Sequence, residues 1–324
     1  MRIPAFVFLA AFAAAAHCTI AQAQSYPGKP IRWIVPYPGG GITDVVTRMV
    51  TQKMSGPLGQ PIVVDNRPGA NSILGSDLAA KSAPDGYTML TVIAGYSANV
   101  TLYAGKLPFD PLKDLAPVSL AAIAPLIMTV NPNVPAKDVR ELIAYAKANP
   151  GRLNFGSSGI GAAAHLTTEL LKQTAGVDMV HVPFKGTAPA MQAVMADDIQ
   201  VLVDTPLSLM PQARAGKLRA LGMFSEKRLL AYADVPTLAE AGGPALESST
   251  WVLFMAPGAT QKEIVNRLAA EAAKAVREPD VQERLAQTGI EPVGNTPEQA
   301  KRFLDAEIAK WSKVIAAAGV KAEQ

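Results

Sequence analysis

Cysteine is almost absent from this chain of 324 residues. Its single cysteine, Cys18, lies in an N-terminal segment, 1–23, that is typical of a cleavable secretory signal. Arg2 is the basic start, an apolar run follows it, and Ala21-Gln22-Ala23 forms an A-x-A cleavage site. Cleavage there would leave a mature chain without thiols, which excludes disulfides, thiolate metal sites and cysteine nucleophiles. We therefore expect an exported protein.

Long apolar runs and clustered charge are also missing. After the signal, no segment is long and apolar enough to cross a membrane. The net charge is only +3 and lysine and arginine do not cluster, so we predict no nucleic-acid partner. A chain of this length can form about two domains with cores of their own.

Histidine is scarce, with three residues in the whole chain. His165 and Glu169 lie four apart on an expected helix and form a possible metal pair, but the only other histidine outside the signal is His181. A metal site would therefore need carboxylates that the sequence does not identify. A structural histidine is the better interpretation, and we predict no metal and no cofactor.

The sequence contains one incomplete dinucleotide-binding motif and one incomplete nucleophile-elbow motif. Gly159-Ile160-Gly161 with Ala164 fits a loose G-x-G-x-x-A dinucleotide pattern. The acidic residue expected at the end of the next strand is missing, because Pro183-Phe184-Lys185 stands there. Gly156-Ser157-Ser158-Gly159 lacks the second glycine of a G-x-S-x-G nucleophile elbow. Neither motif supports a function on its own.

The most informative stretch is 31–48, which reads IRWIVPYPGGGITDVVTR. An apolar strand, 31–35, breaks at a proline and turns through three glycines, 39–41. Apolar residues then recur with helical spacing, and Thr43 or Asp44 can cap the start. A glycine turn at a helix N-terminus presents unpaired N–H groups and a positive dipole end, which bind small anions. An ordinary strand–helix turn is the alternative interpretation.

Strands and helices alternate along the chain, as in parallel sheets with helices on both faces. An apolar run at 121–130 indicates strands that lead from one lobe into another. The tail has too little strand for a separate domain and is expected to return to the first lobe. We predict a two-lobed α/β protein in which each lobe is a mostly parallel sheet flanked by helices. Two crossovers join lobe 1, formed by 24–128 and 225–324, to lobe 2, formed by 129–224.

A second glycine-rich turn, 156–161, also lies between an expected strand and an expected helix. In open α/β sheets, ligands bind outside the carboxyl ends of the strands. If the lobes face each other, both helix N-termini point into one cleft, which favours a site for an anion or carboxylate. Asp204 follows a buried strand, so we expect it either to accept a hydrogen bond from a ligand or to cap the next helix. A loop containing Ser97 is expected after the strand at 87–92.

Seven segments spread over the chain are similar to a known family. They are YPGKPIRWIVPYPGGGITDVVTR from Tyr26, VVDNRPGANSILGSDLAAKSAPDGYTML from Val63, GSSGIGAAAHL from Gly156, VPFKGTAPAM from Val182, GKLRALGMFSEKR from Gly216, DVPTLAEAG from Asp234 and WVLFMAPGAT from Trp251. Together they resemble the Bug, or TctC-type, solute-binding proteins of tripartite tricarboxylate transport systems. The resemblance covers nearly the whole mature chain.

This resemblance implies a type II periplasmic binding protein, or Venus flytrap, with a small carboxylate or related solute between its lobes. The loops Tyr37–Asp44 and Ser157–Gly161 would hold the solute, largely through backbone N–H groups and bridging waters. Three features depart from the family pattern. Tyr37 stands where Phe is commoner, alanines at 162–164 replace frequent Ser or Thr, and Leu253 replaces a frequent glycine. These departures concern the ligand and not the fold.

We therefore predict a periplasmic, monomeric solute-binding receptor, not an enzyme, that captures a small organic anion such as a carboxylate or amino acid. It would deliver this solute to the membrane components of a tripartite tricarboxylate-type transporter. Docking on a membrane sensor kinase is an alternative. A secreted α/β hydrolase using Ser157 or Ser158 near His165 is less favoured, because Ser and His within one turn leave no independent base. The predicted ligand-binding residues are Tyr37, Gly39, Gly40, Gly41, Thr43, Asp44, Ser97, Ser157, Ser158, Gly159, Gly161, His165, Lys185 and Asp204.

Overall fold

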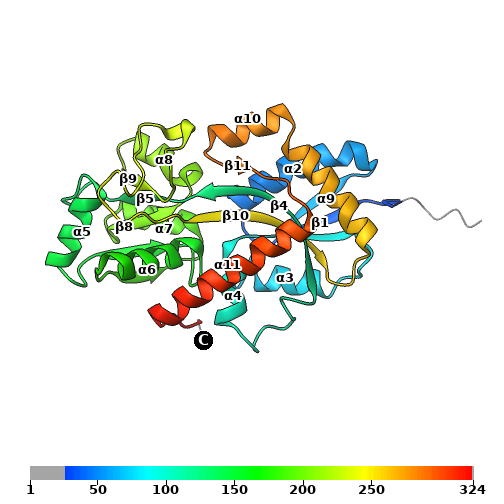
Figure 1. Ribbon diagram of the computed structural model, residues 1–324, viewed down its shortest axis with the longest axis horizontal. Coiled ribbons are helices and arrows are strands. Elements are labelled where there is room, and N and C mark those ends of the chain that lie inside the picture. The colour runs from blue at the N-terminus through cyan, green and yellow to red at the C-terminus, as the bar shows by residue number, and fades with distance from the viewer. Residues whose placement is uncertain (1–25, 323–324) are drawn as a thin grey trace, which may run out of the picture.

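The computed structural model describes residues 26–322, so the signal predicted at 1–23 lies outside the described residues. Two β-sheets lie towards opposite ends of an elongated molecule, each with helices packed around it (Figure 1). Within the described range, no helix has both the length and the apolar character needed to cross a bilayer. The predicted two-lobed α/β fold is confirmed.

The first sheet has six strands in the order β11–β4–β10–β3–β1–β2. They are β1 (Ile31–Val35), β2 (Ile62–Asn66), β3 (Thr88–Val92), β4 (Leu115–Pro125), β10 (Ser249–Pro257) and β11 (Glu291–Pro292). β1 runs parallel to both neighbours, and Trp33 pairs with Val64 on one side and Met89 on the other. β10 is antiparallel to both β3 and β4.

The second sheet has five strands in the order β7–β6–β8–β5–β9. They are β5 (Ile127–Val130), β6 (Asn154–Ser157), β7 (Val180–Pro183), β8 (Val201–Asp204) and β9 (Arg219–Met223). β6 is parallel to β7 and β8, whereas β5 is antiparallel to β8 and β9. Both sheets are therefore mixed rather than mostly parallel. In the first sheet the reason is connectivity, because β4 takes the chain out to the second sheet and β10 brings it back.

Helices follow most of the strands. Those associated with the first sheet are α2 (Ile42–Leu58), α3 (Ile73–Ala80), α4 (Ala94–Leu102), α9 (Lys262–Val276), α10 (Pro279–Gln287) and α11 (Pro297–Ala318), and those around the second are α5 (Val139–Ala148), α6 (Ala163–Ala175), α7 (Thr187–Met195) and α8 (Pro206–Arg214). The loop expected around Ser97 is wrong, because α4 begins at Ala94. Its Ala98 is fully buried, so tertiary packing overrides the weak helix propensity of the nearby glycine.

Two connecting segments, which lie side by side, join the two sheets. β4 leads into β5 through Leu126, and the returning chain enters β10 from Ser248 (Figure 1). Leu126 N–H donates to Ser248 O at 3.0 Å, and Phe224 N–H donates to Leu126 O at 2.8 Å. These hydrogen bonds tie the outgoing and returning segments together.

The segment between β9 and β10 packs with the second sheet. It contains a short 3₁₀ turn, η1 (Leu230–Tyr232), and its Leu238 belongs to the same buried cluster as Met128. Thr237 also bridges to Met223 of β9. The predicted lobe 1 includes all residues after 224. These contacts instead place the segment before Ser248 with the second sheet, so the chain crosses back to the first sheet near Ser248. The reason is that the backbone of this segment pairs with the end of β9 before the chain crosses to the first sheet.

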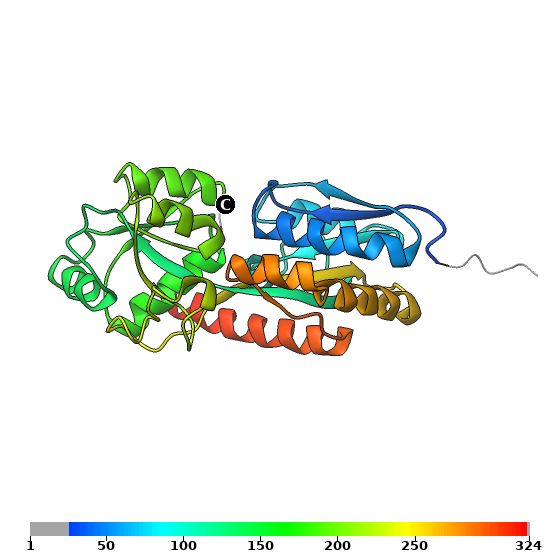
Figure 2. The ribbon, with the colours of Figure 1, turned by 90° about the horizontal axis from the view of Figure 1, so that it is seen from above.

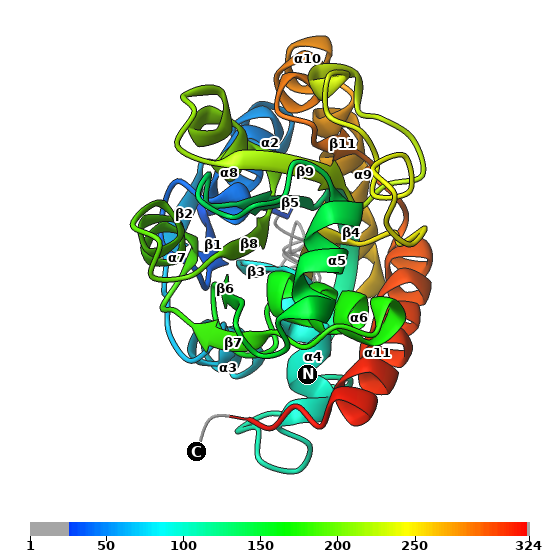
Figure 3. The same ribbon diagram turned by 90° about the vertical axis from the view of Figure 1, so that its left-hand side faces the viewer.

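The C-terminal helix α11 runs beside the first sheet and reaches the second half of the molecule, where it contacts α6 (Figure 2). Trp311 and Ile315 of α11 pack in one buried cluster with Ala98 of α4 and Leu166 of α6. Seen from the end of the second sheet, α6 and α11 lie next to each other (Figure 3). This cluster joins helices from both halves of the molecule.

Candidate ligand-binding site

The first glycine loop lies between β1 and α2. Gly39, Gly40 and Gly41 are exposed, and Gly40 has a φ of 86°, in the left-handed region that favours glycine. Gly41 is the N-cap of α2, and no side chain caps this helix. The N–H groups of its first turn therefore have no intrahelical acceptor and are available to an anion.

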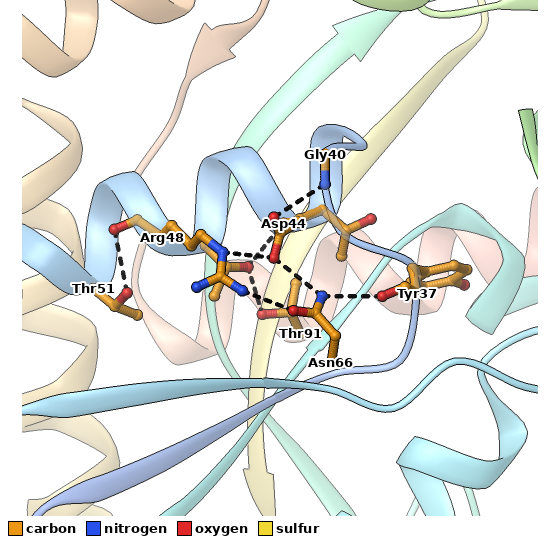
Figure 4. Close-up of polar contacts among 9 residues, drawn as sticks. Tyr37, Gly40, Asp44, Arg48, Thr51, Asn66 and Thr91 are labelled. Carbon is orange, nitrogen blue, oxygen red and sulfur yellow. Dashed lines mark hydrogen bonds and ion pairs between the residues drawn. The ribbon is translucent and has the colours of Figure 1, made fainter. Parts of the chain in front are cut away.

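Asp44 holds this loop from the first turn of α2 (Figure 4). Its Oδ2 accepts Gly40 N–H at 3.1 Å, and its Oδ1 accepts Arg48 Nε at 2.8 Å and Asn66 Nδ2 at 3.0 Å. Burial raises the pKa of the Asp44 carboxyl, but these donors outweigh burial and bring the pKa below its usual value. The carboxylate is engaged by the protein, which gives it a role in shaping the loop.

Arg48 and Asn66 complete this network, although neither is among the predicted site residues. Asn66 ends β2, donates through Nδ2 to Tyr37 O at 3.0 Å and accepts from Arg48 Nη2 at 2.7 Å. The four-residue spacing from Asp44 to Arg48 is a recognisable helix pair and could have indicated the ion pair from sequence. Asn66 comes from another strand, and no local spacing indicates it.

A buried chain of hydroxyl groups supports the start of α2. Trp33 Nε1 donates to Thr91 Oγ1 at 2.8 Å, and the Thr91 and Thr47 hydroxyls are 2.9 Å apart. Thr47 Oγ1 donates to Thr43 O at 2.6 Å, so its single proton is used and Thr91 is the donor to Thr47. Thr43, one of the predicted residues, is itself buried. It lies under the loop.

Tyr37 turns its hydroxyl away from solvent. Its Oη is buried and makes no hydrogen bond of normal geometry within the described residues. The same is true of Ser72 Oγ, although the two hydroxyls interact electrostatically. Burial raises the pKa of Tyr37 to about 12, and Ser72 opposes this rise. The hydroxyl that distinguishes this position from the commoner Phe is therefore directed into the protein.

The second glycine loop lies between β6 and α6. Gly159 and Gly161 have φ values of 141° and 79°, and Ser157 is fully buried. Ser157 Oγ donates to Gly159 O at 2.9 Å and accepts Gly159 N–H at 3.2 Å. Gly161 N–H donates to His165 Nδ1 at 3.1 Å. Ala162, the N-cap of α6, provides no side-chain cap, so this helix also begins with free N–H groups.

Two histidines stack behind this loop. The ring centroids of His165 and His181 are 3.7 Å apart with 7° between the planes, and His181 Nε2 lies 2.7 Å from Ser157 Oγ. The pKa of His165 is lowered to about 3 by burial first, then by the neighbouring His181 and by the Lys172 ammonium, and the pKa of His181 is lowered to about 4 by burial and then by Lys172. Both rings are therefore neutral near pH 7. The sequence indicated His165 but not this role for His181.

The other predicted residues differ widely in exposure. Ser158 is half-buried, and its hydroxyl makes no hydrogen bond to any described residue. Lys185 is exposed. Ser97 is fully buried inside α4, where its hydroxyl donates to Ala94 O at 2.6 Å. The hydroxyl of Ser97 is therefore used within its own helix.

Asp204 ends β8 between the starts of two helices. Its Oδ1 accepts Thr205 N–H at 2.7 Å, and its Oδ2 accepts the Thr187 hydroxyl at 2.7 Å. Burial raises the pKa of Asp204, against the effect of these hydrogen bonds. The expected capping of the next helix is not observed, because Asp204 accepts the N–H of the N-cap residue Thr205 itself and α8 has no side-chain cap. The other expected role, a hydrogen bond from a ligand, stays a prediction.

Most helices of the described residues follow the carboxyl end of a strand. α2, α4, α6, α7 and α8 follow β1, β3, β6, β7 and β8, and none of them has a side-chain cap. In contrast, Asp138 caps α5 and Thr296 caps α11. α3 and α9, which follow β2 and β10, also lack side-chain caps, as does α10, which follows α9. An uncapped start after a strand is therefore common in this fold and does not by itself single out a binding site.

Asn71 connects the second glycine loop to the helices of the first sheet. Its Nδ2 donates to Ile160 O at 3.1 Å and to Asn99 Oδ1 at 3.1 Å. Ala70, Asn71 and Ser72 all have positive φ, a costly conformation for residues other than glycine. This strained turn brings a carboxamide across to the second half of the molecule. From sequence, the turn is indistinguishable from an ordinary loop.

Residues 46–320 match the family described as tripartite tricarboxylate transporter family receptor. The chain belongs to this receptor family. The resemblance noted in the sequence is confirmed, and it rests on most of the chain rather than on one motif. The description of the family identifies its members as receptors of a transport system.

Three solved structures are similar to this receptor over nearly their full length. R. palustris Rpa4515, solved with adipate, has a TM-score of 0.85 and 33% identity and covers 91% of this chain and 99% of its own. MatC (Rpa3494) from Rhodopseudomonas palustris, with bound malate, has a TM-score of 0.81 and 33% identity over 90% and 100%. The periplasmic binding protein BugD has a TM-score of 0.82 and 31% identity over 92% and 100%.

In this receptor the serine and histidines do not reproduce the arrangement expected of a hydrolase. Ser157 is fully buried and directs its proton to Gly159 O, and it contacts His181 rather than His165. A nucleophile must be open to its substrate and bonded to a base that takes its proton. The structure therefore does not contain the Ser157–His165 pair that the hydrolase hypothesis needs, and the Ser158 hydroxyl makes no hydrogen bond to either histidine.

Proposed function

We propose that this receptor captures a small dicarboxylate between its two glycine loops, 39–41 and 157–161, in the periplasm. It acts as a monomer, carries out no chemistry and delivers the solute to a tripartite tricarboxylate-type transporter. Ligand binding favours the closed arrangement because the ligand contacts both loops only when the lobes are together.

The observation that carries this proposal is the pair of uncapped helix N-termini behind the two loops. α2 begins at Gly41 and α6 begins at Ala162, and neither has a side chain on its free N–H groups. A carboxylate at a helix N-terminus is favoured by about 0.3–1 kcal/mol, rising to about 2 kcal/mol in a partly buried site. A dicarboxylate has one charged group for each helix, and adipate and malate, the ligands of two similar structures, are dicarboxylates.

Backbone N–H groups supply most of the positive potential in this proposal. Arg48 beside the first loop is paired with Asp44, so its charge is largely compensated. Lys185 lies just beyond the second loop, since the neighbouring Phe184 N–H donates to Ser157 O at 3.0 Å. Lys185 is exposed and adds a screened attraction rather than a fixed contact. Recognition would therefore depend on loop geometry more than on charged side chains.

A pair of glycine variants tests the first loop against a matched control. Gly40 and Gly59 lie before and after α2, both have positive φ, and an added Cβ at either meets nothing within 4 Å. Ala at either position adds a similar left-handed strain of roughly 1–2 kcal/mol. We expect Gly40→Ala to weaken the binding of adipate or malate about tenfold or more, since the loop must change shape. We expect Gly59→Ala to leave binding unchanged.

The affinities are measured by isothermal titration calorimetry. The protein is first unfolded, freed of any bound ligand and refolded. Adipate and malate are compared with hexanoate, which has one carboxylate, and with adipamide, which has none. Binding of the dicarboxylates in preference to both controls supports the proposal. Equal loss of affinity in both glycine variants, or no dicarboxylate binding by the unmodified protein, would contradict it.

A further inference from the structure

The buried pair His165 and His181 has a defined place behind the second glycine loop. The rings come from α6 and β7 and stack almost parallel, and each ring contacts the loop through one nitrogen. His165 contacts the backbone of Gly161, and His181 contacts the hydroxyl of Ser157. The two histidines therefore hold the two ends of the loop 157–161.

The proton on His181 follows from the hydrogen bonds of Ser157. A serine hydroxyl has one proton and two lone pairs. Gly159 O can only accept, so it takes the Ser157 proton, and Gly159 N–H can only donate, so it uses one lone pair. The remaining lone pair faces His181 Nε2 at 2.7 Å. His181 must therefore carry its proton on Nε2 and donate it to Ser157.

The proton on His165 follows from Gly161. The Gly161 N–H donates to His165 Nδ1, so Nδ1 has no proton and the neutral ring carries its proton on Nε2. That Nε2 faces Glu169 Oε1 at 4.0 Å. Protonating Nδ1 would bring two donors face to face and break the contact with Gly161.

The surrounding groups favour two neutral rings. Glu169 is the acid facing His165, but its Oε1 also accepts from Lys172 Nζ at 2.9 Å, which compensates its charge. Lys172 Nζ lies over the ring of Phe155 at 5.5 Å from the centroid, and Phe155 in turn stacks with His181 at 4.9 Å. A proton on either histidine would place a cation against its stacked neighbour and near Lys172. These are the charged groups that act on the pair.

We propose that His165 and His181 are positioning residues that set the shape of the second glycine loop through two opposite contacts. His165 accepts through an unprotonated Nδ1, and His181 donates through a protonated Nε2. Neither histidine touches the ligand; each acts through the loop. The inference rests on the proposed function only in that the loop binds the dicarboxylate.

The opposite contacts allow a test with four variants. An Asn side chain can place its amide oxygen near the position of Nδ1, whereas the longer Gln places its amide near the position of Nε2. At position 165, His165→Asn keeps an acceptor for Gly161 and His165→Gln does not. At position 181, His181→Gln keeps a donor for Ser157 and His181→Asn does not. All four variants lose the stacked ring.

We expect adipate affinity to be nearly retained in His165→Asn and His181→Gln and to fall about tenfold in His165→Gln and His181→Asn, the loss of one buried hydrogen bond. A role in filling space makes a different prediction, because Gln fills the space of a histidine better than Asn at both positions. If Gln is better than Asn at both positions, or if all four variants bind equally, the proposal is overturned.

A second readout does not need the ligand. In ¹⁵N-labelled unmodified protein at pH 7, both histidines should show a protonated Nε2 and an unprotonated Nδ1, and a protonated Nδ1 on either ring would contradict the proposal. All four ligand-free variants lose the ring current of one histidine, and the Gly159 and Gly161 amide shifts should change further in His165→Gln and His181→Asn than in the other two variants. If adipate does not bind at all, the proposed function fails while this readout still decides the role of the histidines.

Discussion

The two glycine loops are built alike but supported by opposite means. The first is exposed and is held by an ionised carboxylate, since Asp44 binds the Gly40 N–H and is paired with Arg48. The second is held by buried neutral imidazoles, His165 and His181. Each support satisfies loop donors or acceptors without using the first N–H groups of the following helix. The difference shows that the same uncapped helix start can be maintained by a charged or by a neutral partner.

The difference predicts that the two loops respond to acid in different pH ranges. His165 and His181 have folded-state pKa values of about 3 and about 4, below the ordinary value of 6.5. Between these values the unfolded chain binds protons that the folded chain refuses, so acid destabilises the fold from about pH 6.5 downward. The pKa of Asp44 is also lowered, from 3.8, so its stabilising contribution is complete above pH 3.8 and is lost only as the pH falls further.

The largest expected effect is therefore on stability between pH 7 and pH 5. The free energy of unfolding should fall by about 1.4 kcal/mol per pH unit for each histidine once the pH is well below 6.5. Urea unfolding of the mature protein should show this loss, and the double variant His165→Asn/His181→Gln should have a much flatter pH dependence. These are the only histidines outside the predicted signal, so the comparison is direct. Parallel curves for the two proteins would contradict the assignment of neutral histidines.

Removing the carboxylate of the first loop should have the next largest effect. Asp44→Ala removes the carboxylate that accepts from Gly40 N–H, Arg48 Nε and Asn66 Nδ2, and we expect a loss of about 3 kcal/mol at pH 7, in the range for hydrogen bonds to a charged group. Asp44→Asn keeps an acceptor for Gly40 and should lose about half as much. Denaturant unfolding measures both. If the two variants are equally stable, the charge of Asp44 is not what holds the loop.

A smaller effect is expected at the link between the halves. Asn71→Ala loses the hydrogen bonds to Ile160 and Asn99 but keeps a side chain at a φ of 46°, so we expect a loss of about 2 kcal/mol. Asn71→Gly loses the same bonds but relieves the left-handed strain, and it should be more stable than Asn71→Ala by about 1 kcal/mol. The reverse order in thermal unfolding would show that the strain assigned to this turn is wrong.

The smallest effect on stability is expected for removing the Arg48 side chain from the network around Asp44. Arg48 is half exposed, and exposed ion pairs contribute less than about 1 kcal/mol. Arg48→Ala should therefore change stability by less than 1 kcal/mol, and the change should shrink in 0.5 M NaCl because salt screens the pair. A loss as large as that of Asp44→Ala would mean that the arginine, and not the carboxylate, is the central group of the network.

Local sequence patterns predict much of this fold. The apolar strand at 31–35, the glycines after it and the helical spacing that follows correctly predict β1 and α2. Glycine-rich turns between strands and helices correctly indicate where the two loops lie. These features depend on neighbours within a few residues.

The polar partners of the loops could not be predicted from the sequence in the same way. Asn66 and Asn71 come from other parts of the chain, and the stacking of His165 on His181 joins a helix to a strand. No periodicity encodes such contacts, because they depend on how elements pack in three dimensions. The burial of Ser97 within α4 has the same cause, since its neighbour Ala98 packs in a cluster with residues of α6 and α11. The assignment of predicted residues as ligand contacts therefore stays a prediction.

The most direct test of the account is an NMR titration of ligand-free protein with adipate. The account predicts that the amides around Gly40 and Gly41 and those around Gly159 and Gly161 shift together with a single midpoint. The amides of Gly59 and Gly176, at the far ends of α2 and α6, should stay unchanged. Shifts confined to one loop, two separate midpoints, or no shift in either loop would contradict the claim that one dicarboxylate bridges both helix N-termini.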